Sequence, residues 1–438
     1  MLPAVTGRSP TTAVLGAGAL GLTTALRLAQ RGERVIVIER ERLPGGLASG
    51  FEIAPGQWLE KFYHHLFRTD RRAIGLIDEL GLGGDLRWIR PRTVVLRDGR
   101  MHQLDSAGSL LRFRPLPPTD RLRMGAWLAY LRILRSPDSL EGQTAAAWIR
   151  SHMGAAAYEV VWGPLLGAKF GSRAEEVAMP WFWARVHDRS AELGYLVGGF
   201  QRLYERLAER VEGLGGEIRL GTEVREIRTA PSGIVVLTVA DDAEQVLSVD
   251  RVISTLATRL TCRLTPELPP DYRARHEWGE AFGAHCLVLS LDRKLTDAYW
   301  VNVNDPGYPF LALVEHTNYM SPVDYGGRHL VYLGNYRPMD DPLLRATTDE
   351  AVEQLAPHLE RINRAFRREW ITEAWSFAAP FAQPVVTTDY REHIPPFETP
   401  IPGLWVASMF QVYPHDRGQN YSIDLAERLV ARLSGAGR

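Results

Sequence analysis

The sequence predicts an α/β protein in which a parallel sheet covered by helices is interrupted by a helical insert and by an α+β domain with a mixed sheet. Three observations predict this fold class. An apolar strand, a glycine-rich turn, a helix and a second strand follow one another in residues 12–39. Apolar residues recur with helical spacing in residues 119–166, and short strands separated by turn residues fill residues 284–337.

The first of these stretches contains, in order, the parts of a unit that binds a dinucleotide. An apolar strand leads into the spacing Gly16-x-Gly18-x-x-Gly21, which opens a helix of good helix formers. The first glycine permits a tight turn, the second lets the backbone approach a pyrophosphate, and the third lets the helix pack close to the strand. The second strand ends at Glu39, where a carboxylate can bond ribose hydroxyls. The stretch therefore predicts a Rossmann-like domain.

Two features after the second strand narrow the choice of dinucleotide. Glu39 disfavours a ribose that carries a 2′-phosphate, because two negative groups would be forced together, so NADP is the least expected ligand. Arg40 follows, and then the glycine pair Gly45-Gly46. Glycines at this place are either a plain surface turn or a close approach of the backbone to the inner phosphate and ribityl chain of an extended FAD.

These residues resemble the extended fingerprint of FAD enzymes in the superfamily of amine oxidases, protoporphyrinogen oxidase, phytoene desaturases and UDP-galactopyranose mutase. The resemblance returns in the middle of the chain, at residues 198–203, and again at its end. It implies FAD as the cofactor, held by Gly16, Gly18, Gly21, Glu39, Arg40, Gly45, Gly46, Leu47, Ala48, Val224, Gly418, Asn420 and Tyr421. The last three lie where the final helix is expected to begin, and a positive helix end stabilises the anion of a reduced flavin.

Four catalytic candidates come from segments similar to UDP-galactopyranose mutases. Residues 65–70 are similar to the HxFxTD segment of these enzymes, which implies that His65 lies against the isoalloxazine ring. The residues alone explain this stretch equally well as core. Lys169 belongs to a Lys/aromatic/Gly segment that resembles one of the mutase and protoporphyrinogen oxidase families, which implies that it closes the helical insert near the cofactor. Arg417 and Tyr421 follow the order of the mutases, with a spacing one residue shorter, and are candidates for holding a diphosphate.

The pattern of elements divides the chain into five segments. Residues 1–105, 196–260 and 396–438 are expected to form one discontinuous FAD-binding domain. The short strands expected within residues 85–105 are predicted to line the flavin. Residues 106–195 are expected to form the helical insert. Residues 261–395 are expected to form the substrate domain, in which the strands are followed by one long helix, from 347 to 366.

Composition excludes several classes of protein. With 438 residues the chain is long enough for several cores, and its net charge of −1 at pH 7 argues against broad nucleic-acid binding, which needs a strongly basic face. Cys262 and Cys286 have no metal-type neighbours, which predicts buried free thiols and no metal site. No targeting segment and no apolar run of transmembrane length is present, so we expect a cytoplasmic location.

Arginines cluster in residues 112–135. A basic amphipathic region of this kind is either a solvated face or a surface that rests on a membrane, and the solvated face is the favoured interpretation. The expected partner is a small-molecule substrate, and the sequence does not give the oligomeric state.

Three functions are compatible with these patterns. The first hypothesis is an FAD-dependent oxidoreductase of the amine oxidase or protoporphyrinogen oxidase type, with hydride transfer from a C–N or C–C bond of a small organic substrate to flavin N5. The alternative is a redox-neutral sugar-nucleotide mutase that uses reduced flavin as a nucleophile. The third is a flavoprotein that only binds its cofactor within an assembly.

Overall fold

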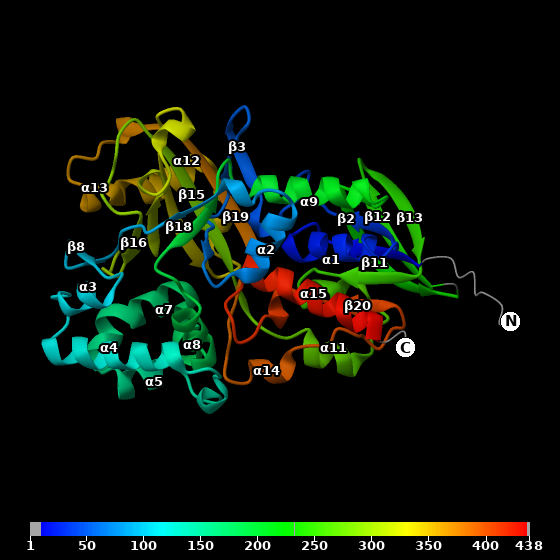
Figure 1. The fold of residues 1–438 in the computed structure, drawn as a ribbon, viewed down its shortest axis with the longest axis horizontal. Coiled ribbons are helices and arrows are strands. Elements are labelled where there is room, and N and C mark those ends of the chain that lie inside the picture. Colours follow the sequence, from blue (N-terminus) through cyan, green and yellow to red (C-terminus); the bar gives the residue numbers. More distant parts are fainter. Residues whose placement is uncertain (1–9, 232, 436–438) are drawn as a thin grey trace.

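The computed structural model describes residues 10–231 and 233–435. A parallel sheet with the strand order β10-β2-β1-β14-β20 forms the centre of one half of the molecule (Figure 1). Its strands are Glu217–Arg219, Arg34–Ile38, Thr11–Leu15, Arg251–Ser254 and Leu404–Val406. The beginning, the middle and the end of the chain therefore meet in one sheet, as the discontinuous domain predicted from the sequence requires.

The central strands are buried on both faces, which explains their continuous apolar runs. Val14 and Val37 face the helices α1 (Ala19–Ala29), α9 (Gln201–Gly213) and α15 (Gln419–Gly435). On the other face, Leu15 and Ile36 pack against an antiparallel sheet of β11 (Thr222–Ala230), β12 (Gly233–Ala240) and β13 (Ala243–Val249). The helices α10 (Thr258–Leu264) and α11 (Pro270–His276) continue that second layer.

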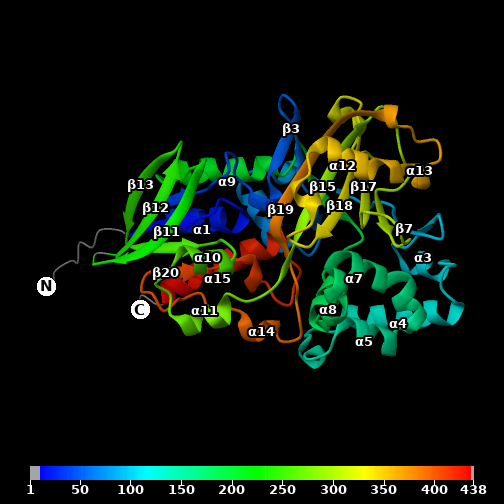
Figure 2. The ribbon, with the colours of Figure 1, turned by 180° about the vertical axis from the view of Figure 1, so that it is seen from behind.

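A larger mixed sheet forms the second half of the molecule, with the order β19-β15-β18-β17-β16-β7-β8 (Figure 2). Its strands are Ile371–Pro384, Ala281–Leu291, His329–Arg337, Ala312–Glu315, Trp300–Val303, Thr93–Arg97 and Arg100–Gln103. All neighbours are antiparallel except β16 and β7. The strand at residues 94–96 was expected to line the flavin with the first segment, and it pairs here instead, because Val94 and Leu96 complete the apolar core of this sheet.

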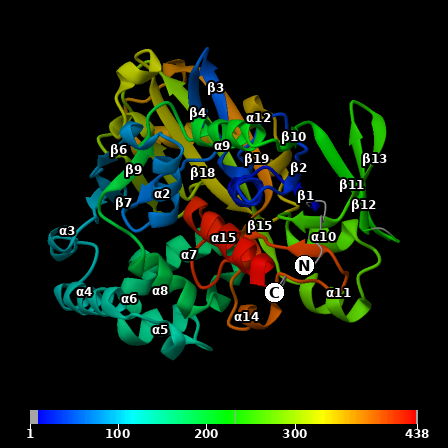
Figure 3. The same ribbon diagram turned by 45° about the vertical axis from the view of Figure 1, so that its right-hand side comes forward.

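The helical insert lies beside the mixed sheet, where α7 packs against β18 (Figure 3). It contains α3 (Ala107–Leu111), α4 (Pro118–Ile133), α5 (Ala145–His152), α6 (Ala155–Ala157), a π-helical turn Tyr158–Trp162, α7 (Gly163–Phe170) and α8 (Met179–His187). Two smaller sheets, β3 (Gly50–Ala54) with β4 (Gln57–Glu60), and β5 (Leu66–Phe67) with β9 (Leu193–Leu196) and β6 (Leu86–Ile89), connect the two halves. The domain limits drawn from the sequence remain predictions.

One expected element is wrong. The helix predicted over residues 347–366 is broken into α12 (Thr348–Leu355) and the short α13 (Leu359–Ile362). Pro357 lies between them, and proline cannot donate the hydrogen bond that would continue α12. The short helices α2 (Arg71–Glu79) and α14 (Tyr390–His393) complete the helices named here.

Both cysteines are buried free thiols, as predicted. Among the described helices, none is long and apolar enough to span a bilayer.

Candidate functional site

Two glycines of the first turn are required by the packing of the protein itself. Gly16 has φ +104°, and its N–H donates to the Ile38 carbonyl at 2.8 Å. A Cβ on Gly21 would lie 1.9 Å from the carbonyl oxygen of Gly16. Any side chain at Gly21 would therefore push α1 away from β1, as the sequence pattern predicts.

Gly18 differs from these, because the protein does not need a glycine there. Its φ of −77° suits any residue, and a Cβ would meet nothing nearer than Gly46 Cα at 3.9 Å. Gly18 begins α1, forms a bridge with Gly45, and no side chain caps the helix. A ligand that approaches the backbone explains the missing side chain, and the uncapped helix N-terminus suits a phosphate. The turn therefore fits the pyrophosphate of FAD.

The second glycine pair completes this cradle. Gly45 and Gly46 have φ of +119° and +58°, the left-handed region, and the Gly45 N–H donates to the Ala17 carbonyl at 2.8 Å. A short turn, Gly46–Ala48, follows. Ala48 is buried, and Leu47 packs against a small cluster from the mixed sheet. The loop thus connects the nucleotide end of the site to the second half of the molecule.

Glu39 lies at the carboxyl end of β2, next to the glycine turn. Its carboxylate accepts hydrogen bonds from the backbone N–H groups of Ala17 at 2.8 Å and Glu41 at 2.9 Å. The Thr222 N–H donates to the Glu39 carbonyl at 2.8 Å, which brings the start of β11, and with it Val224, to the same end of the sheet. Arg40 is exposed and pairs with Glu41 at 3.1 Å.

The start of α15 offers main-chain rather than side-chain groups to a ligand. The side-chain oxygen of Asn420 accepts from the backbone N–H groups of Arg72 at 3.0 Å and Ala73 at 3.2 Å, which ties α15 to the start of α2. Gly418 is exposed, and a Cβ there would meet nothing nearer than Tyr421 at 3.9 Å. An accessible helix start without a side chain suits a flavin carbonyl.

The Asp416 carboxylate lies at the centre of a cluster of positively charged side chains. Its carboxylate accepts from Lys169 Nζ at 3.1 Å, from Trp181 Nε1 at 3.2 Å and from Arg185. Burial opposes the ionisation of Asp416, but the cations outweigh burial and hold the pKa of this carboxyl below its usual range. Burial and the neighbouring Arg185 lower the pKa of Lys169 well below its usual value.

Arg417 and Tyr421 are both bonded to partners within the protein. Arg417 donates to Gln383 Oε1 at 2.6 Å and to Tyr336 Oη at 2.7 Å. The Tyr421 hydroxyl donates to Asp188 at 2.6 Å, and its ring stacks on His415 at 4.4 Å. Burial and the Asp188 carboxylate raise the pKa of Tyr421. The structure therefore brings Lys169 and Arg417 together around Asp416, with Tyr421 in an adjoining network.

His65 forms no hydrogen bond with the Asp416 cluster and has aromatic neighbours instead. Its nearest polar partner is the Tyr299 hydroxyl, 3.4 Å from Nδ1, and the rings of Phe67 and Trp300 flank it. Burial lowers the pKa of His65 to about 3 and that of His64 to about 4, although both side chains keep accessible surface. The lowered pKa values reflect the many protein atoms that surround these half-buried side chains.

Arg189 lies near His65, and the sequence analysis did not identify it. It is exposed, yet burial and the positive charge of Arg185 lower its pKa to about 9, and its charge contributes to lowering the pKa of His65. Its guanidinium lies 5.8 Å from the Phe67 ring centroid, and among the described residues no carboxylate forms an ion pair with it. Arg189 lies just beyond the end of α8, and no sequence pattern singled it out.

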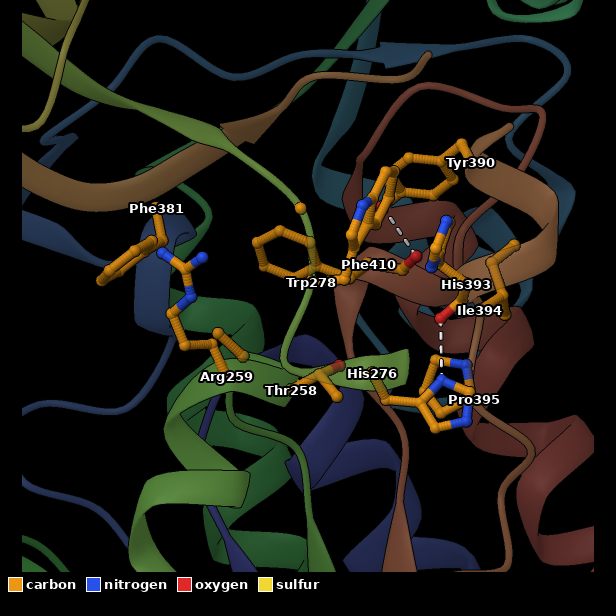
Figure 4. Close-up of a pocket in the computed structure, with 12 residues that line it drawn as sticks. Thr258, Arg259, His276, Trp278, Phe381, Tyr390, His393, Ile394, Pro395 and Phe410 are labelled. Atoms are coloured by element: carbon orange, nitrogen blue, oxygen red, sulfur yellow. Dashed lines mark hydrogen bonds between the residues drawn. The ribbon is translucent and has the colours of Figure 1, made fainter. Parts of the chain in front are cut away.

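A small hollow, with a cavity volume of about 30 Å³, lies between α10, α14 and the end of β19 (Figure 4). Trp278 stacks on His393 at 3.9 Å, and Tyr390 and Phe410 lie on the same side. Thr258, at its edge, is 3.4 Å from the Ser408 hydroxyl, just beyond β20. This places the hollow beside the carboxyl end of the parallel sheet, and the sequence analysis named none of its residues.

Similar proteins agree with this architecture. Residues 21–415 match the family described as flavin containing amine oxidoreductase. An L-amino acid dehydrogenase of Synechocystis sp. is 25% identical over 306 residues, which are 64% of this chain and 63% of that protein, so the match spans less than two thirds of the relative. The fold is similar to reduced UDP-galactopyranose mutase, with TM-score 0.77, 16% identity and 98% and 96% coverage of the two chains.

Putrescine oxidase bound to putrescine is also similar in fold, with TM-score 0.72, 18% identity and 98% and 99% coverage. The family match extends over most of the chain, and the cradle of Gly18, Gly45 and Gly46 fits the cofactor that the family requires. The chain is therefore an FAD-binding enzyme that belongs to the family of flavin-containing amine oxidoreductases.

Proposed function

We propose that this enzyme oxidises a small organic substrate that carries a carboxylate or another compact anion, by removing hydride from a C–N or C–C bond. The observation that carries this proposal is the cation beside His65, the guanidinium of Arg189, which forms no ion pair with a carboxylate among the described residues. When bound, FAD supplies the acceptor for the hydride. The relative named L-amino acid dehydrogenase supports an anionic substrate, because an amino acid carries a carboxylate.

Two cations of the site, Arg417 and Arg189, form no ion pair with a carboxylate among the described residues. Asp416 is shared by Lys169 and Arg185, whereas Arg417 bonds the neutral groups of Gln383 and Tyr336. Arg189 keeps its charge at neutral pH, because its pKa falls only to about 9. The exposed guanidinium of Arg189 is free of an ion pair among the described residues and can form a bidentate bond with a substrate anion.

Other side chains near Arg189 and Asp416 suit the amino end of such a substrate. His64 and His65 are neutral at pH 7, because burial lowers the pKa of both, so they do not repel an ammonium group. Lys169 Nζ lies between the rings of Trp181 and Tyr336, 4.9 and 5.4 Å from their centroids. Nζ donates to the Asp416 carboxylate at 3.1 Å, so the pair of Lys169 and Asp416 adds no net charge beside the amino group of the substrate.

The contacts give less support to the sugar-nucleotide mutase. That hypothesis assigned a diphosphate to Arg417 and Tyr421, and both side chains are bonded to protein groups at 2.6 to 2.7 Å. Binding a diphosphate there would require these bonds to break. The likeness to reduced UDP-galactopyranose mutase is a likeness of fold.

The proposal is tested by anaerobic reduction of the bound flavin. We would add L-amino acids to the oxidised enzyme and, as matched controls, the amines that lack only the carboxylate, and follow the visible flavin band. We expect the amino acids to bleach the flavin and the decarboxylated amines to do so far less. Bleaching by both sets alike would contradict the role of the anion, and isomerisation of UDP-galactopyranose by dithionite-reduced enzyme would favour the mutase.

A further inference from the structure

The outer face of α4 carries an apolar stripe that the core does not use. Leu122, Ala126, Ala129 and Ile133, hereafter the α4 stripe, recur at intervals of three and four residues and are all exposed. Leu122 is 65% exposed and Ile133 77% exposed. The opposite face of the same helix, with Met124 and Leu131, is fully buried in the core of the insert.

Arginines surround the α4 stripe without acidic partners. Arg121 and Arg132 lie along one side of the stripe, Arg123 along the other, and Arg112, Arg114 and Arg135 near its ends. Those with hydrogen bonds donate to backbone carbonyls, as Arg121 does to Leu116 and Arg132 to Arg189. Within the described residues, none of the six forms an ion pair with a carboxylate. Asp120, the acid of α4, faces Gly154 on the buried side.

A solvated face, which the sequence favoured, does not explain this pattern. On a solvated helix face the outward positions are polar, whereas here the outward positions are the apolar ones and the charges flank them. An apolar face bordered by arginines is the pattern of a helix that lies in the interface of a membrane, with the apolar side chains among the acyl chains and the guanidinium groups at the phosphates.

We propose that the α3–α4 surface rests on an anionic lipid bilayer. The position of α4 permits it, because the helix lies at the outer lower edge of the molecule, away from α1 and α15 of the other half (Figures 1 and 3). Its 16 residues span roughly 24 Å at the helical rise, so the whole stripe can lie flat on a surface. Leu111, 55% exposed, extends the apolar surface beyond the helix, where its carbonyl accepts from Arg121.

A second copy of the chain is a poorer occupant of this surface. In a two-fold dimer the same patch would meet itself, so the arginines of one copy would face those of the other. A nucleic acid would satisfy the arginines and leave the apolar stripe in contact with charged backbone. Phosphates above an apolar layer satisfy both parts of the surface, and only a bilayer offers that arrangement.

The test is flotation of the FAD-loaded enzyme with vesicles of phosphatidylcholine and phosphatidylglycerol in equal parts, and with vesicles of phosphatidylcholine alone. We expect binding to the anionic vesicles that weakens with salt, and much weaker binding to the neutral ones. The double variant Leu122→Ser/Ile133→Ser should lower the partition coefficient by about tenfold or more. Arg114→Gln/Arg135→Gln should lower it by about fivefold for each arginine.

A matched control distinguishes binding through the α4 stripe from non-specific adsorption of exposed apolar side chains to vesicles. Val246→Ser/Val323→Ser removes two apolar side chains that are 68% and 82% exposed elsewhere on the molecule, and should leave the partition coefficient unchanged. All of the replaced side chains are exposed, so flavin content and melting temperature should match the wild type. Absence of binding to anionic vesicles, or unchanged binding by Leu122→Ser/Ile133→Ser, would overturn the proposal, and the first result would make an acidic protein the better partner for the arginines.

Discussion

Replacing Gly18 with valine should abolish FAD retention while leaving the apoprotein folded. The extended backbone of Gly18, φ −77° and ψ −177°, suits a β-branched residue, and a Cβ meets no protein atom nearer than 3.9 Å. We therefore expect the free energy of unfolding of the apoprotein to change by less than about 1 kcal/mol. The isopropyl group would occupy the space that the pyrophosphate needs. Losing two charge-assisted hydrogen bonds, about 1.5 to 3 kcal/mol each, raises Kd about 10²- to 10⁴-fold.

Two measurements check this prediction, the flavin-to-protein absorbance ratio and the melting temperature with and without added FAD. The wild type should gain about 2.7 kcal/mol of stability when free FAD is about 100 times Kd, and Gly18→Val should gain none. Gly84→Val, at an exposed glycine with no atom within 4 Å, is the matched control. Gly21→Ala should instead destabilise the apoprotein, because its Cβ meets the Gly16 carbonyl at 1.9 Å. A yellow Gly18→Val protein with full FAD content would refute the reasoning.

Four further predictions concern single side chains. Arg189→Gln should raise KM for anionic substrates about 10- to 100-fold and leave KM for their uncharged analogues unchanged, because one charged hydrogen-bonding partner is lost; equal effects on both would contradict its role. His65→Ala should retain FAD but change the rates of flavin reduction and reoxidation in stopped flow, and unchanged rates would remove His65 from the site. Asp416→Asn should lower the free energy of unfolding in urea by about 3 to 5 kcal/mol, because Lys169 and Arg185 lose their buried partner; a loss below about 1 kcal/mol would show that the pair is not desolvated. Burial raises the pKa of Glu60 to about 7, so the folded protein binds the proton more tightly than the unfolded chain, and this group makes stability fall as pH rises from 4.5 to about 7. Glu60→Gln should reduce that fall by up to about 3 kcal/mol, and an unchanged pH profile of unfolding would show that Glu60 ionises freely.

The cofactor cradle could be predicted because its constraints are local. Gly16, Gly21 and Glu39 act within one strand, turn, helix and strand, and the distances that require glycine join atoms of that unit. The cofactor and the superfamily follow from this stretch. The break at Pro357 was also visible in the sequence, and the prediction of one helix over residues 347–366 failed because apolar periodicity was given more weight than the proline.

The substrate side depends on contacts that no local pattern records. Arg417 is bonded to Tyr336 on β18 and to Gln383 on β19, and the sequence analysis did not identify β19 at all. Arg189 differs from the other arginines of the insert by its place beside His65, whose pKa its charge helps to lower, and only the tertiary structure shows this neighbour. The pairing of β7 with β16 likewise joins strands about two hundred residues apart, beyond the range of any periodicity.

The central claim is that this enzyme takes electrons from an anionic substrate. The most direct measurement is the anaerobic stoichiometry of one turnover, in which the oxidised enzyme is mixed with an L-amino acid and both the bleached flavin and the oxidised product are counted. We predict one product molecule for each flavin reduced, and loss of this reaction in Arg189→Gln with FAD content unchanged. A flavin that stays oxidised with every anionic substrate, together with turnover of a sugar nucleotide by the reduced enzyme without net electron transfer, would contradict the account.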